Sequence, residues 1–246
     1  LEGIYAMKEG SALAAIDIGS NSILLETARL EHGRIRLQLH RKETIRLGGA
    51  LDASGQLHLH AMQRGWDCLQ RYAQLIAHVP TAHRRVAATQ TLREAANRMQ
   101  FLDRAAAILQ CPIEVITGEQ EARLIYQGVA LFLTQQDGPR LVVDIGGRST
   151  ELALGHGARL AHASSYPLGS VAWAQQFFPD GTLSEQAFAQ ARAAALQVLA
   201  PAAAALQLLV PAQDLAVYGA SGTAGAISKV LGAQGHESGG ITRADR

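Results

Sequence analysis

A short pattern, Asp-Ile-Gly-x-x-Ser, occurs twice in the chain, each time directly after a short apolar run. The first copy lies in LAAIDIGSNSIL at residues 13–24 and the second in LVVDIGGRSTEL at residues 141–152. In both halves the pattern opens a succession of predicted strand, loop, strand and strand, followed by helices. The two halves share little other sequence. An internal repeat of this kind predicts two related α/β domains that place the same turn at the same point of the fold.

Hydrophobic periodicity predicts the individual elements. In the first half we expect a loop at 48–57 and helices at 59–78, 90–109 and 118–133, with strands at 12–18, 23–30, 35–47, 84–89 and 112–117. In the second half we expect strands at 141–147, 149–155 and 158–169, a helix at 184–208, and a strand, a glycine-rich turn and a helix within 215–231.

Composition limits the classes of partner. Of 246 residues, 48% are hydrophobic and 17% charged, which suits a packed core and argues against disorder. A net charge of +1 gives no overall basic field for duplex nucleic acid or an anionic membrane, and no apolar run reaches the ~18 residues of a membrane span. Cys68 and Cys111 have no metal-binding spacing, so buried free thiols and a cytoplasmic location are expected.

The glycines at the repeated turns indicate anion binding. Glycine lets backbone N–H groups approach a ligand, and successive amides in such a turn form a concavity that holds anions. Asp17 and Asp144 stand at the two junctions of strand and turn, where a carboxylate repels phosphate unless a cation, a water or a proton lies between them. One such turn alone is a common structural feature, whereas two at matched positions favour a phosphate cradle. A third loop, GASGT at 219–223, opens a helix whose amides suit an anion.

Five segments, taken together and in this order, resemble the exopolyphosphatase and guanosine pentaphosphate phosphohydrolase family: AAIDIGSNSILL, ATQTLREA, ITGEQEARLIYQGV, LVVDIGGRSTEL and YGASGT. The resemblance runs from about residue 13 to the end of the chain. It implies the superfold of actin, sugar kinases and Hsp70, that is, two related ribonuclease-H-like (actin-like ATPase) domains with an interdomain cleft that encloses phosphate. We expect an expression remnant or a disordered start at 1–10 and domains at 11–124 and 125–246.

The resemblance assigns the catalytic role to Glu121, which would activate the attacking water. A carboxylate in the first turn of a helix beside phosphate loops is compatible with that role. The alternative is that Glu119 and Glu121 only stabilise the helix N-terminus, which explains Glu119 well. By the same resemblance Arg93 contacts phosphate with its planar fork of donors.

Further residues are assigned by matching the loops of the family. The substrate-binding set comprises Gly19, Ser20, Asn21, Ser22, Gly146, Gly147, Arg148, Ser149, Thr150, Ser221 and Gly222. The resemblance also implies Mg²⁺, which Asp17, Asp144 and Glu151 would hold directly or through water. Arg148 departs from the small residue that the family commonly carries, and its side chain either adds a cation to the phosphate site or points to solvent.

The expected activity is that of an exopolyphosphatase, which releases terminal phosphate from inorganic polyphosphate by Mg²⁺-assisted attack of water. The alternative substrate is guanosine pentaphosphate, which would connect the protein to the stringent response. An alternative of another class is a non-catalytic regulator that binds these polyanions. By the same resemblance we expect the second domain to be incomplete at GGITRADR, and we expect the full-length protein to carry a C-terminal helical domain, as longer family members do, and to form a homodimer.

Overall fold

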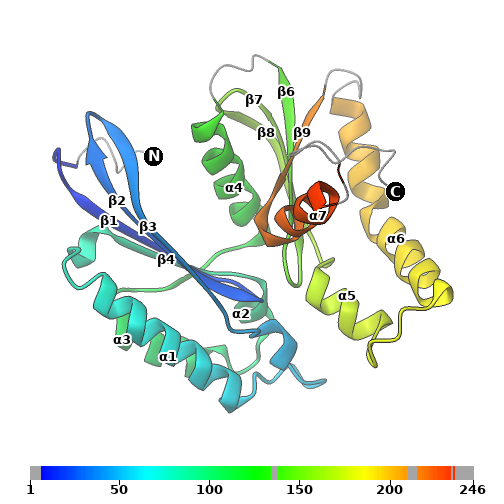
Figure 1. Ribbon diagram of the computed structural model, residues 1–246, viewed down its shortest axis with the longest axis horizontal. Helices are drawn as coiled ribbons and strands as arrows, with labels where there is room; N and C mark the ends of the chain where they lie inside the picture. The colour runs from blue at the N-terminus through cyan, green and yellow to red at the C-terminus, as the bar shows by residue number, and fades with distance from the viewer. Residues whose placement is uncertain (1–6, 134–137, 210–214, 234, 236–246) are drawn as a thin grey trace. The chain divides into compact units, whose positions relative to one another are not determined.

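The computed structural model describes residues 7–133, 138–209, 215–233 and 235. The chain divides into two compact units, residues 1–116 and 117–246 (Figure 1). The division lies at the start of helix α4 (Gly118–Phe132) rather than at the expected 124/125, because Ala122 and Tyr126 of α4 belong to a core of the second unit. Helix α4 therefore follows the first unit in sequence but packs on the second sheet.

The first unit is a five-stranded sheet in the order β3-β2-β1-β4-β5. Strands β1, β2 and β3 are antiparallel neighbours, and β4 and β5 run parallel to β1. The strands are β1 (Ala12–Ile18), β2 (Ser22–Glu31), β3 (Arg34–Thr44), β4 (Arg84–Ala88) and β5 (Glu114–Val115). The helices are α1 (Leu59–Leu75), α2 (Gln90–Glu94) and α3 (Arg98–Leu109), with short 3₁₀ turns η1 (Gly48–Ala50) and η2 (Thr81–His83).

Strand β1 shows how the first core is built. Ile16 and Ile18 are buried, whereas Ala15 and Asp17 between and beside them are exposed, which is the alternation of a strand with one covered face. Helices α1 and α3 lie together beneath that sheet (Figure 1). Gly65 of α1 lets them approach, because a Cβ there would lie 2.7 Å from Phe101 Cε2. The cysteines Cys68 and Cys111 are buried free thiols, as predicted.

The single helix predicted at 90–109 is wrong, since the segment forms α2 and α3 with a break between them. Asn97 lies in the break, where its Oδ1 accepts from the Leu57 N–H at 2.9 Å and its Nδ2 donates to the Leu57 carbonyl at 3.0 Å. This double contact with a distant loop anchors the chain and interrupts the helix. The strand predicted at 112–117 is shorter than expected, since β5 covers two residues.

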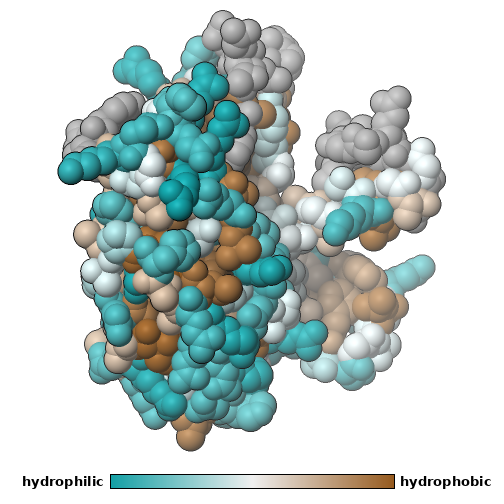
Figure 2. All heavy atoms as spheres, turned by 60° about the vertical axis from the view of Figure 1, so that its left-hand side comes forward, coloured by the Kyte–Doolittle hydropathy of each residue, from teal (hydrophilic) through white to brown (hydrophobic). Residues whose placement is uncertain are grey.

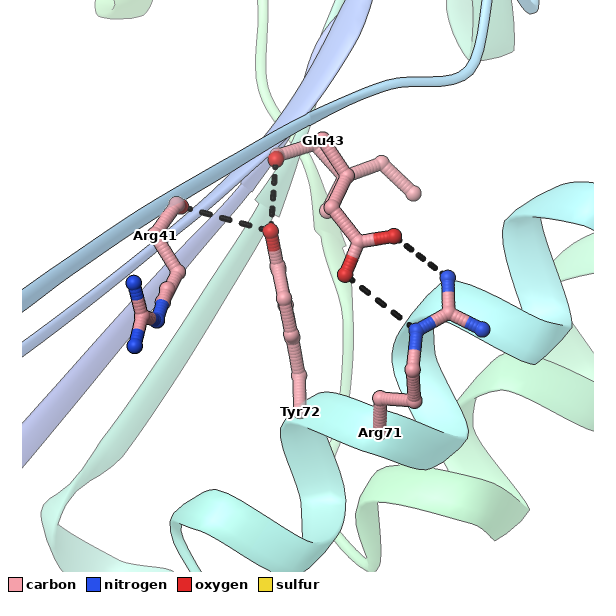
Figure 3. Close-up of polar contacts among 5 residues, drawn as sticks. Arg41, Glu43, Arg71 and Tyr72 are labelled. Carbon is pink, nitrogen blue, oxygen red and sulfur yellow. Dashed lines mark hydrogen bonds and ion pairs between the residues drawn. The ribbon is translucent and has the colours of Figure 1, made fainter.

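Helix α1 is tied to β2 and β3 by polar contacts (Figure 3). The Tyr72 hydroxyl donates to the carbonyl of Ile23 at 3.1 Å and lies 3.3 Å from that of Arg41. From the preceding position of α1, the Arg71 guanidinium forms an ion pair with Glu43 (Figure 3). The contacts hold the edge strand β3 against the helix although most of its residues are exposed.

Strand β3 is the outer strand of the first sheet, and charged side chains protect its free edge from pairing with another chain. The basic residues along it are Arg34, Arg36, Arg41 and Lys42. Figure 2 brings the side of the first unit forward and shows a largely hydrophilic surface broken by hydrophobic patches.

The second unit is a four-stranded sheet in the order β8-β7-β6-β9, with β6, β7 and β8 antiparallel and β9 parallel to β6. Its strands are β6 (Pro139–Ile145), β7 (Thr150–His156), β8 (Arg159–Tyr166) and β9 (Ala216–Ala220). Its remaining helices are α5 (Ser170–Phe177), α6 (Glu185–Leu209) and α7 (Ser221–Ala233). Helix α4 covers one face of the sheet and α6 the other (Figure 1).

The order of strands in the two units confirms the predicted repeat. In each unit three antiparallel strands come first, and the next strand pairs in parallel with the first of them. The sequence did not predict α5, because its eight residues are too few for a clear helical period, and the strand expected at 158–169 ends at Tyr166. In the described part of the chain no helix is long and apolar enough to cross a membrane.

Candidate functional site

The repeated pattern forms the same turn in both units. In the first loop (residues 19–22) the Gly19 N–H donates to the Ser22 carbonyl at 3.1 Å, and in the second loop (residues 146–149) the Gly146 N–H donates to the Ser149 carbonyl at 2.9 Å. A Cβ at Gly19 would lie 2.9 Å from the Ser22 oxygen, and one at Gly146 would lie 3.1 Å from the Ser149 oxygen. Close approach of backbone to backbone therefore excludes a side chain at Gly19 without a backbone shift, and leaves a tight fit for one at Gly146.

Carbonyl groups of the second loop accept hydrogen bonds from the start of α5. The first three amides of α5 donate to the carbonyls of Gly146 and Gly147, at distances of 2.8 to 3.1 Å. In a trans peptide the C=O and the following N–H point in opposite directions, and no cis peptide occurs in the described residues. The N–H groups of Gly147 and Arg148 are therefore directed away from α5, which is the orientation that an anion cradle needs.

The first loop is also held through its carbonyl groups, but these lie one position further along the loop than those used in the second. The Gly48 N–H donates to the Ser20 carbonyl at 2.7 Å, and the amides of Ile45 and Arg46 donate to the Asn21 carbonyl at 2.9 and 2.8 Å. These donors come from the segment directly after β3, as those of the second loop come from the segment after β8. The strand predicted over 35–47 ends earlier, at Thr44. Ile45 and Arg46, which were expected in that strand, instead donate their N–H groups to the first loop.

Three polar side chains form a row across the second sheet. Asp144 on β6 lies opposite Glu151 on β7, and Glu151 lies opposite Ser165 on β8. The Ser165 hydroxyl donates to Glu151 Oε1 at 2.7 Å, and Ser149 also hydrogen-bonds the Glu151 carboxyl group. Since alternate residues of a strand share a face, Glu151 lies on the same side of β7 as Ala153, which packs against α4.

The carboxyl groups of this site interact strongly. Glu151 is 2% exposed, and its burial raises its pKa to about 7, with further contributions from the negative charges of Glu121 and Asp144. The hydrogen bonds from Ser165 and Ser149 oppose the rise, because they favour the charged form. Glu121 and Asp144 are thus both close enough in the second unit to act on Glu151.

The start of α4 explains why Glu121 lies near the carboxyl group of Glu151 whereas Glu119 faces solvent. Thr117 Oγ1 accepts from the Gln120 N–H at 3.1 Å, and Gln120 Oε1 accepts from the Thr117 N–H at 2.7 Å, which forms a capping box. Gln120 is therefore used in the cap. Glu119 is exposed, whereas Glu121 is partly buried beside Ala122 of the core.

The first unit lacks the second carboxylate of this row. Asp17 lies opposite Leu24, which occupies the position that Glu151 has in the second unit, and Asp17 is exposed. The Ser22 hydroxyl corresponds to that of Ser149 but has no hydrogen-bond partner among the described residues. The predicted metal ligand Asp17 thus belongs to one unit, and Asp144 and Glu151 to the other. Across the described residues no group of three or more His, Cys, Asp or Glu is arranged to hold a metal ion.

Arg93 lies on α2, which begins where β4 ends beside β1. The Thr89 N–H before this helix donates to the Ile18 carbonyl at 3.3 Å, so α2 starts next to the first loop. Gln90 Oε1 accepts from Arg93 Nε at 2.9 Å and from a terminal nitrogen at 2.6 Å, and the other terminal nitrogen donates to the Ile116 carbonyl at 2.8 Å. The guanidinium group is thereby fixed in direction.

The third predicted loop is shorter than expected, because β9 runs to Ala220 and α7 begins directly at Ser221, with Gly222 exposed in its first turn. Ser221 has a φ of +67° and its hydroxyl donates to the Ile145 carbonyl at 3.0 Å, next to the second loop. Thr150 is buried and donates to the Leu168 carbonyl at 2.5 Å. Its neighbours Leu152 and Leu154 face α6, so Thr150 lies on the opposite face of the sheet from Glu151.

Sequence reasoning missed three residues that support the site: Gln90, Ser165 and Gly169. Gln90 holds Arg93, Ser165 binds Glu151, and Gly169 contacts the backbone of the second loop. The dipeptide Gly169–Ser170 ahead of an apolar segment is a helix-start signal that could have indicated α5. The contacts of Ser165 and Gln90 leave no comparable signal.

Comparison with known proteins adds independent information. The sequence profile of the Ppx/GppA phosphatase family matches residues 27–246. The solved structure of the PPX-GPPA enzyme from Aquifex aeolicus is 28% identical, with a TM-score of 0.72 over 91% of this chain and 72% of that one. An exopolyphosphatase-like protein is 29% identical, with a TM-score of 0.82 over 92% and 70%. An exopolyphosphatase from Cytophaga hutchinsonii, at 24% identity and a TM-score of 0.80 over 93% and 73%, supports the fold alone.

Proposed function

The chain belongs to the Ppx/GppA phosphatase family, and its two units have the actin-like ATPase fold. From this premise we propose that it hydrolyses the terminal phosphoanhydride bond of inorganic polyphosphate. The observation that carries the proposal is the grouping of three carboxyl groups on the α4 face of the second sheet. Asp144 and Glu151 stand just before and just after the second loop in sequence, and Glu121 comes from the first turn of α4. Carboxylates beside a loop whose amides are directed away from α5 suit the hydrolysis of an anionic phosphoryl group.

In the proposed reaction Glu121 orients the attacking water and accepts its proton. The water oxygen forms a bond to the terminal phosphorus, the bond from that phosphorus to the bridging oxygen breaks, and the shortened chain leaves with the bridging oxygen. Amides of the second loop stabilise the charge on the equatorial oxygens. Phosphoryl transfer needs little covalent chemistry from the protein, so positioning and electrostatics account for the rate.

The donor chemistry of the second unit fits Mg²⁺. Asp144 and Glu151 provide two carboxyl groups side by side, and burial among like charges raises the pKa of Glu151 to about 7, a cost that a bound cation offsets. Mg²⁺ in phosphoryl-transfer sites is held by one or two carboxylates, with substrate phosphates and waters as the other ligands, which agrees with the absence of a larger ligand group among the described residues. When bound, the ion would neutralise charge on the transferring phosphoryl group.

The phosphate contacts remain part of the proposal. Arg93, held by Gln90 and the Ile116 carbonyl, places a fixed guanidinium charge next to the first loop, where it would attract phosphate oxygens. The first loop offers further backbone amides. Arg148 is partly buried at the second loop, where its side chain adds positive charge near the proposed substrate. For Thr150 we propose an indirect role, since its hydroxyl is engaged with Leu168.

A steady-state assay of phosphate release tests the proposal. Purified protein is incubated with Mg²⁺ and either long-chain polyphosphate or guanosine pentaphosphate, and released phosphate is followed over time. The proposal predicts a higher kcat/KM for polyphosphate. A higher value for guanosine pentaphosphate would assign the site to that nucleotide, and tight binding of polyphosphate without release of phosphate would identify a non-catalytic binding protein.

A further inference from the structure

Gly169 is in unusually close contact with the second loop. A Cβ built on Gly169 would lie 2.3 Å from the backbone nitrogen of Arg148, 2.4 Å from its Cα and 2.4 Å from the carbonyl carbon of Gly147. All three are backbone atoms, which cannot rotate out of the way as a side chain could. The φ of Gly169 is −145° and its ψ is 153°, an extended conformation that any residue adopts. Glycine is needed here for space and not for its backbone freedom.

The surroundings of Gly169 hold it at this distance. On one side Thr150 Oγ1 donates to the carbonyl of Leu168 at 2.5 Å, and the Leu168 N–H donates to the Tyr166 carbonyl at 2.7 Å. On the other side the amides of α5 donate to the second loop, and the Ser170 hydroxyl adds a bond of 3.1 Å to the Gly146 carbonyl. A side chain at 169 could be accommodated only by breaking one of these sets of bonds.

We propose that Gly169 is a positioning residue of the second loop, acting through α5. Its missing side chain lets the first amides of α5 reach the carbonyls of Gly146 and Gly147, and these bonds direct the following N–H groups toward the phosphate. The inference rests on the proposed function and deepens it, because it names what orients the phosphate donors. Loss of the charge-assisted hydrogen bonds from these two amides should lower the affinity for an anion about 10- to 100-fold.

The first variant to test is Gly169→Ala in the full chain. Affinity for tripolyphosphate is measured by calorimetry, and the N–H signals of Gly147 and Arg148 are followed by NMR during the same titration. We expect affinity to fall about 10- to 100-fold and the two signals to lose their response. Gly128→Ala is the matched control, since it adds the same methyl group to a helix of the same unit, where nothing lies within 4 Å, and it should bind like the unchanged protein.

A second variant avoids the added methyl group. Ser170→Pro removes the N–H and the hydroxyl that reach Gly146, at the first position of a helix where proline is well accepted, and the extended Gly169 suits a following proline. Ser170→Ala keeps the N–H. We expect Ser170→Pro to weaken tripolyphosphate binding more than Ser170→Ala, with circular dichroism spectra unchanged in both.

The outcomes separate this inference from the proposed function. If the unchanged protein binds tripolyphosphate but releases no phosphate, the hydrolase proposal fails while the affinity ratios still test Gly169. Wild-type affinity in folded Gly169→Ala, or equal affinities of the two Ser170 variants, would overturn the positioning role. Absence of any response of Gly147 and Arg148 to tripolyphosphate in the unchanged protein would overturn it as well.

Discussion

Asp144 and Glu151 lie directly opposite each other on β6 and β7, so two carboxyl groups share one face of the second sheet. At the equivalent place in the first unit, Asp17 lies opposite Leu24. The two units therefore repeat the loop but not the carboxylate pair. Because Glu121 also belongs to the second unit and acts on Glu151, the acidic chemistry of the chain is concentrated there.

This pairing predicts how stability depends on pH in the metal-free protein. The pKa of Glu151 is raised from its usual 4.5 to about 7, so between these values the folded state binds more protons than the unfolded state. The stability associated with this group is fully present below pH 4.5 and is lost as pH rises through about 7. We measure the free energy of unfolding of Glu151→Gln and of the unchanged protein by urea denaturation in EDTA. As pH rises from 5 to 8, we expect the unchanged protein to lose stability relative to Glu151→Gln. A difference between the two proteins that stays constant over this range would contradict the prediction.

The sequence predicts local features of the fold well and distant contacts poorly. The alternation around Ile16 and Ile18, and the turn that follows Asp17 and Asp144, can be inferred from neighbouring residues. The break between α2 and α3 cannot, because it depends on a contact of Asn97 with Leu57, 40 positions away.

The same limit holds for the candidate site. The first turn of α4 and both loops are visible in the sequence as motifs. The bond from Ser165 to Glu151 depends on the register of β7 and β8, and the contact of Gly169 with the second loop depends on where α5 begins. Support from strand partners and from a short, weakly periodic helix becomes evident only in three dimensions.

Mg²⁺ should stabilise the folded protein through Asp144 and Glu151. A ligand that binds only the folded state raises the melting temperature with its concentration, and deprotonated carboxyl groups bind the ion better. We expect a larger rise in melting temperature with Mg²⁺ at pH 8 than at pH 5, and its loss in Asp144→Asn. An equal rise in the Asp144→Asn variant would show that the ion binds elsewhere.

Arg93→Lys should weaken substrate binding more than it slows the chemical step. Lysine keeps the charge but cannot reproduce the fork that Gln90 and the Ile116 carbonyl hold. We expect KM for polyphosphate to rise about tenfold with kcat changed less, as for the loss of one charge-assisted bond. Arg36→Lys on the exposed edge strand is the control. Unchanged KM in Arg93→Lys would remove Arg93 from the binding site.

Tyr72→Phe tests the contact between α1 and the first sheet. The change removes a buried hydroxyl that donates to Ile23 and lies near the Arg41 carbonyl (Figure 3). We expect the free energy of unfolding to fall by about 1 kcal/mol, because a buried carbonyl loses its donor. Urea denaturation measures the change, and a variant as stable as the unchanged protein would show that the contact contributes nothing.

The catalytic role of Glu121 is tested most directly by phosphate release from polyphosphate in Mg²⁺, compared among the unchanged protein, Glu121→Gln and Glu119→Gln. Removing a general base should lower kcat of Glu121→Gln by roughly 10²–10⁴ while the affinity for tripolyphosphate is kept. Glu119→Gln, which changes an exposed residue of the same helical turn, should release phosphate at the normal rate. Normal turnover in Glu121→Gln would contradict the account.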